Sequence, residues 1–187
     1  MERVPAIRPL LASLLAIGLV GCAHPTSAPV VDPGIELPGF QAGPVSSLSL
    51  EQVAADARDP VELAGLLEAY GFTGATVRAY SAGVGGPIRT VRVEVISFEE
   101  QSGAEAYLGW LHEHATDLVG DVQPESSEHL PVAFVLSHVP TGCCSKEQPV
   151  WLTAWRSQNV AVWVQVIGPD VRRERFGQLV GRLQGSA

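Results

Sequence analysis

Basic side chains are scarce in this sequence. Twelve lysines and arginines stand against 20 aspartates and glutamates, Lys146 is the only lysine, and the net charge is −8. Nucleic acids and anionic lipid surfaces are bound by clusters of lysine and arginine. The composition therefore argues against both as partners.

The short motifs of common catalytic sites are also missing. Neither GxSxG nor SxxK occurs, and the sequence His112-Glu113-His114 is not HExxH, because residues two apart on a helix point in different directions. The glycine-rich stretch 81–87 lacks the full GxGxxG spacing and leads into a strand, so it is not a phosphate loop. We therefore predict a protein that is not an enzyme, with no catalytic residues and no cofactor.

Cysteine is nearly absent, with Cys22, Cys143 and Cys144 as the only three. We predict that the adjacent Cys143 and Cys144 form a disulfide, which would be strained because neighbouring α-carbons lie nearer than a relaxed disulfide prefers. The alternatives are a disulfide to a partner, a redox switch, free buried thiols, or a soft-metal site with His138 as third ligand. No CxxC motif supports the metal site, and we assign no metal ligands.

The first 22 residues have the parts of a secretion signal. Arg3 and Arg8 give a positive start, Leu10 begins an apolar run, and the segment ends in Leu19-Val20-Gly21-Cys22. The run is shorter than the roughly twenty residues of a permanent membrane helix. This ending resembles the lipobox of bacterial lipoproteins. The resemblance implies cleavage before Cys22 and acylation of its sulfur and its new amino group, with palmitate among the acyl chains.

The same resemblance sets the predicted domains and location. Residues 1–21 are the signal peptide, whose removal brings the net charge to −9. Residues 22–47, rich in proline, glycine and serine, are a flexible tether that begins with the lipidated cysteine. Residues 48–187 have the size of one globular domain. We predict a chain held by lipid to the cell membrane, on its extracytoplasmic side.

Hydrophobic spacing predicts one α+β domain with the element order αββαβββα, an antiparallel sheet of about five strands and flanking helices. Asp59 is the expected N-cap of the first helix, Ser102 and Glu105 form a capping box for the second, and Asp170 caps the last. The second helix is expected to run to about Leu118. The predicted strands cover 75–80, 89–97, 132–136, 151–156 and 160–167.

The last two strands form a hairpin with two different faces. Valines alternate on one face of 160–167, and a two-residue turn at Gln158-Asn159 would put Trp151, Thr153 and Trp155 beside them. Either helices cover the opposite face or it is a binding surface. Aromatic rings suit apolar ligands, so we predict a ligand or partner surface on that face. Its residues are Leu152, Trp163 and Ile167.

The layout as a whole resembles the small single-domain lipoproteins of actinobacterial cell envelopes. Some of those are similar in fold to plant photosystem accessory proteins, and others to the extracellular sensor domains of kinases. The resemblance transfers no site residues. We predict a non-enzymatic binding or accessory module for an envelope protein or a small apolar ligand. The alternative is a redox or metal-handling lipoprotein that uses Cys143 and Cys144.

Overall fold

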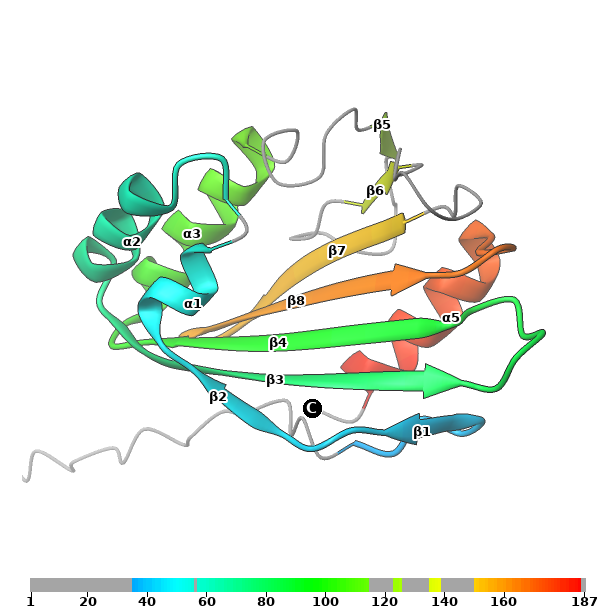
Figure 1. The fold of residues 1–187 in the computed structure, drawn as a ribbon. Helices are drawn as coiled ribbons and strands as arrows, with labels where there is room; N and C mark the ends of the chain where they lie inside the picture. The colour runs from blue at the N-terminus through cyan, green and yellow to red at the C-terminus, as the bar shows by residue number, and fades with distance from the viewer. Residues whose placement is uncertain (1–34, 56, 115–122, 126–134, 139–149, 186–187) are drawn as a thin grey trace, which may run out of the picture.

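The computed structural model describes residues 35–55, 57–114, 123–125, 135–138 and 150–185. They form an antiparallel sheet with helices on both sides, as the sequence predicted for a single α+β domain (Figure 1). The helices are α1 (Leu50–Ala54), α2 (Pro60–Ala69), α3 (Gln101–Glu113) and α5 (Arg173–Gln184). The strands are β1 (Phe40–Ala42), β2 (Ser46–Leu48), β3 (Phe72–Ala82), β4 (Thr90–Phe98), β5 (Gln123–Glu125), β6 (Val135–His138), β7 (Val150–Ser157) and β8 (Val160–Ile167).

Two long hairpins form the centre of the sheet. The strand order is β1-β3-β4-β8-β7-β6-β5, with β2 also paired to β3. The hairpin β7–β8 has the predicted register, with Trp151 opposite Val166 and Trp155 opposite Val162. Gln158 has the positive φ of 54° that the tight turn requires. The pairing of β4 with β8 joins the two hairpins.

Helix α2 begins and ends where its sequence predicts. The Asp59 carboxylate accepts a hydrogen bond from the Glu62 backbone N–H at 3.0 Å, and Pro60 is the first helical residue. Gly71, with φ of 77°, follows the last turn. Local capping chemistry is enough to define this helix.

The predicted caps of α3 and α5 are wrong. Helix α3 starts one residue before Ser102, and its N-cap is Glu100, with no side-chain cap. It ends at Glu113 instead of continuing to Leu118, since His114 has left the helical conformation. The N-cap of α5 is Arg172, because the Asp170 carboxylate instead accepts hydrogen bonds from Arg172 and Arg175.

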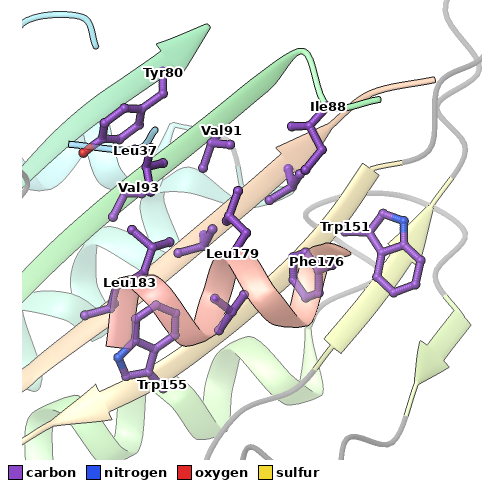
Figure 2. Close-up of a cluster of buried hydrophobic side chains, with 14 of the residues drawn as sticks. Leu37, Tyr80, Ile88, Val91, Val93, Trp151, Trp155, Phe176, Leu179 and Leu183 are labelled. Atoms are coloured by element: carbon purple, nitrogen blue, oxygen red, sulfur yellow. The ribbon is translucent and has the colours of Figure 1, made fainter. Parts of the chain in front are cut away.

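Two hydrophobic cores lie on opposite sides of the sheet. On one side α5 packs on alternate residues of β4, β7 and β8 (Figure 2). On the other side α1, α2 and α3 cover the remaining residues of the same strands (Figure 1). The spacing of the four large apolar residues of α5 is typical of a helix with one inward face, and all four are buried in the first core: Phe176, Leu179, Val180 and Leu183.

The predicted tether is too long, because the chain joins the fold well before residue 48. Strands β1 and β2 both pair with β3, along its outer edge. Leu37 is buried in the core under α5, and the Tyr80 hydroxyl donates a hydrogen bond to the Ile35 carbonyl at 2.9 Å. We call residues 35–48 the arm. Pairing with an otherwise open strand edge and burial of Leu37 favour this docked state over a solvated linker.

Replacing Tyr80 by phenylalanine tests how the arm is held. Loss of the hydrogen bond to Ile35 should lower the free energy of unfolding by about 1 kcal/mol and make the arm more sensitive to limited proteolysis. Tyr70→Phe is the matched control, since its hydroxyl has no hydrogen-bond partner among the described residues. Equal behaviour of the two variants would contradict a stabilising role for this bond.

Candidate functional site

The residues predicted as an open binding surface are largely inside the protein. Leu152 and Trp163 are 1 % and 9 % exposed, and they belong to the core that α1, α2 and α3 cover. Ile167 is partly buried against the same core. The prediction of an exposed apolar face around Trp163 is therefore wrong, because helices cover that face.

A charged cluster surrounds Trp163 within this core. Glu94 on β4 lies directly opposite Trp163 on β8. The Glu94 carboxylate forms an ion pair with Arg92, whose guanidinium carbon lies 5.8 Å from the centre of the Trp163 ring. The Glu94 side chain is 7 % exposed and the Arg92 side chain 32 %, so the ion pair connects the interior to the surface.

Tyr107 of α3 lies in the same core as Trp163 and interacts electrostatically with Glu94. Its hydroxyl is buried, and this burial, together with the negative charge of Glu94, raises the pKa of Tyr107 far above its usual value. The phenol therefore stays protonated at any physiological pH. Because Tyr107 is neutral and the charge of Glu94 is balanced by Arg92, the three residues together carry no net charge.

The cluster borders a part of the sheet whose side chains are accessible. Along one row across the strands, Arg92 lies between Ala79 on β3 and Gln165 on β8. Ala79 is exposed, whereas Arg92 and Gln165 are half-buried. We call these three residues, with Ile167, the shelf. Its one cationic group is Arg92, held in place by Glu94 and Trp163.

Three aromatic side chains form a row along α3: Tyr107, Trp110 and His114. The ring centres of Tyr107 and Trp110 are 6.4 Å apart, and those of Trp110 and His114 are 4.8 Å apart with nearly parallel planes. Beside the outer end of this row is a cavity of about 310 Å³, lined by Arg58, Asp59, Glu62, Trp110 and His114. Its lining is mostly charged, which does not match the large apolar pocket that a hydrophobic ligand would need.

The structure tests only part of the histidine and cysteine predictions. His112 is exposed, as expected for a solvated helix face, but His114 is half-buried and stacks on Trp110. Cys22, Cys143 and Cys144 lie outside the described residues, and for His138 only the backbone position in β6 is described. Within the described ranges, no three histidine, cysteine or acidic side chains come close enough to hold a metal ion.

Sequence reasoning missed the ion pair between Arg92 and the buried Glu94. Their alternation with valines along β4 is typical of a strand with one solvent-facing side. In the structure Glu94 is buried, because β4 is central and helices cover the face that carries it. Only the non-local pairing of β4 with β8 brings Glu94 to Trp163, and no short-range pattern encodes that pairing.

Comparisons with known proteins give a fold and no family. No family description and no curated protein matches this chain. Among solved structures, the extracellular domain of PknH from Mycobacterium tuberculosis is similar, with a TM-score of 0.53 and 14 % sequence identity. The match covers 78 % of this chain and 82 % of that one. The two share a fold. At this identity the likeness says nothing about shared residues or activity.

No helix in the described part of the chain is long and apolar enough to cross a bilayer.

Proposed function

We propose that this chain is a lipid-anchored, extracytoplasmic binding or accessory module without enzymatic activity. The observation that carries the binding role is Arg92, a cation one-third exposed and oriented by a buried carboxylate and an indole ring. A guanidinium fixed in this way can donate paired hydrogen bonds to a carboxylate or phosphate. The likeness of the fold to an extracellular domain is compatible with the location.

The shelf indicates the chemistry of the ligand. Arg92 would meet an acidic group, while Ile167 and Ala79 offer apolar contact beside it. The occupant would be a small molecule with an apolar body and one acidic group, or an envelope protein that presents both features. An acyl anchor at Cys22 would hold the module at the membrane where such partners occur, since several acyl chains give stable attachment.

The anchor is tested by metabolic labelling with an alkyne analogue of palmitate. The full chain should take up label and fractionate with membranes, and the Cys22→Ser variant should lose both properties. A matched Cys143→Ser variant should keep both. Labelling that survives Cys22→Ser would refute this anchor.

The shelf is tested with 1-anilinonaphthalene-8-sulfonate, an apolar anion that fluoresces when shielded from water. We expect saturable binding that weakens about tenfold or more in the double variant Arg92→Gln with Glu94→Gln, because charge-assisted hydrogen bonds contribute about 1.5–3 kcal/mol. Changing both residues avoids leaving the buried Glu94 carboxylate without the Arg92 guanidinium.

Arg58→Gln is the control for this binding experiment, because Arg58 lies at the separate cavity beside α2. It should leave the affinity for the dye unchanged. Circular dichroism spectra should show that all variants are folded. Equal dye binding by the double variant and the unmodified protein would rule out the shelf as the site.

A further inference from the structure

The sheet separates the charges of this protein into an acidic side and a basic side. The acidic side consists of α1, α2 and α3, the residues at their ends, and the sheet face that these helices cover. It holds nine of the described acidic side chains and three arginines. On the side of α5 the balance is reversed, with five arginines and the three acids Glu36, Asp170 and Glu174. The five arginines are Arg78, Arg172, Arg173, Arg175 and Arg182.

Four of these arginines belong to α5 and its N-cap, and all four are exposed. Asp170 accepts hydrogen bonds from Arg172 at 2.9 Å and from Arg175 at 2.6 Å, which orders both side chains. These bonds lower the pKa of Asp170, so it stays ionised and keeps ordering them. The other acids on this side are Glu174 of α5 and Glu36 of the arm, which lines a cavity together with Arg182. The exposed surface of α5 is therefore positively charged within a strongly acidic chain.

The arm brings the N-terminal side of the chain to this same surface. Residues 35–38 and the C-terminal end of α5, through Arg182 and Gly185, line one shallow cavity of about 370 Å³. Cys22 precedes Ile35 by 13 residues, which span about 45 Å at most when fully extended. A lipid anchor at Cys22 would thus hold the domain within about 45 Å of the bilayer, and the chain would enter the domain beside the C-terminal end of α5.

We propose that the exposed surface of α5 lies against the anionic phospholipid surface of the membrane, with the acidic side and the shelf turned away from it. The orientation rests on the lipid anchor proposed above, whereas the affinity for anionic lipid rests only on the arginines. Anionic headgroups attract basic side chains within about one Debye length, which is about 10 Å at 0.1 M salt. The acidic side would be repelled by the same surface.

This arrangement reverses an expectation from composition. The net charge of −8 argued against an anionic lipid surface as partner. The charge is not evenly spread over the surface, because the Arg-Arg-Glu-Arg run at 172–175 and the later Arg182 are gathered on α5 and its N-cap. With both its anchor and its basic helix at the bilayer, the module would present the shelf outward to its partners.

The test measures binding of residues 23–187, which hold every described element and no acyl chain, to sedimenting lipid vesicles. Vesicles of phosphatidylcholine and phosphatidylglycerol in equal parts should bind the protein at low ionic strength, and vesicles of phosphatidylcholine alone should not. Arg173→Gln and Arg182→Gln should each weaken binding about fivefold and together about thirtyfold. Glu174→Gln should strengthen it about fivefold, and high salt should abolish it.

Arg58→Gln, with the same change of net charge on the acidic side, should leave vesicle binding unchanged. The proposal is overturned if phosphatidylglycerol does not promote binding, or if Arg58→Gln weakens it as much as Arg173→Gln does. Because this protein carries no acyl chain, its vesicle binding is independent of the labelling experiment on Cys22. If the unmodified full chain takes up no label but residues 23–187 bind the vesicles, the anchor alone is refuted. If the full chain is labelled at Cys22 but residues 23–187 do not bind the vesicles, the basic lipid contact alone is refuted.

Discussion

Replacing Gly103 by alanine is expected to lower the free energy of unfolding by about 3 kcal/mol or more. A β-carbon at this position of α3 would lie 2.1 Å from the Tyr70 carbonyl oxygen and 3.1 Å from two side-chain carbons of Phe98. The Tyr70 carbonyl belongs to the backbone at the end of α2, so it cannot turn aside as a flexible side chain would. Either α3 moves off the sheet or α2 shifts.

Gly109→Ala is the matched control, in the same helix and with the same added methyl group. A β-carbon at Gly109 would meet no atom within 4 Å. Alanine favours the helix over glycine by about 0.8–1 kcal/mol, so this variant should be slightly more stable. Urea unfolding of both variants measures the difference. A Gly103→Ala variant as stable as the unmodified protein would contradict the close packing of α3 against α2.

Leu152→Ala is expected to cost about 3 kcal/mol, in the range of 2–5 kcal/mol seen when a buried leucine is truncated. Leu152 is 1 % exposed and packs in the core under α1, α2 and α3. The variant removes three carbon atoms from that core and leaves a cavity. This result would separate the observed structure from the sequence-based prediction, in which Leu152 lies on an open surface.

The control for Leu152→Ala is Val84→Ala, in the turn between β3 and β4, where the valine is fully exposed. Surface changes of this kind stay within about 0.5 kcal/mol. Thermal unfolding followed by circular dichroism measures both variants under one condition. If Leu152→Ala changes the free energy of unfolding by less than about 0.5 kcal/mol, Leu152 lies on the surface, as the sequence-based prediction of a ligand surface requires.

Features that depend on neighbouring residues were predictable from the sequence. Helix α2 follows from the Asp59 cap and Pro60, whose chemistry acts over three or four residues. The register of β7 and β8 follows from the two-residue turn that joins them. The inward residues of α5, such as Phe176 and Leu183, follow from helical spacing.

Predictions failed where a distant part of the chain competes with a local signal. Ser102 and Glu105 have the spacing of a capping box, but α3 begins at Gln101 with Glu100 as its N-cap. Asp170 has the residue type of an N-cap but binds Arg172 and Arg175 instead. In both cases a side chain that could cap a helix does not do so in the folded protein.

The candidate site illustrates the same limit. Trp163 was identified from its place in the alternation of β8, yet its neighbours Arg92 and Glu94 come from a strand some 70 residues earlier. The sequence indicated a polar face for β4, but helices that begin elsewhere in the chain bury Glu94 on that face and leave Arg92 one-third exposed. Burial turns two ordinary surface charges into an oriented ion pair.

The sequence by itself determined the α+β class, the hairpin of β7 and β8, helix α2, and the inward face of α5, since these depend on spacing and capping over a few residues. Only the tertiary structure decided that the arm docks on β3, that the face around Trp163 is covered, and that the arginines of α5 lie opposite the acidic helices. These features depend on which strands become neighbours. That choice is made by contacts between residues far apart in the chain, where periodicity carries no information.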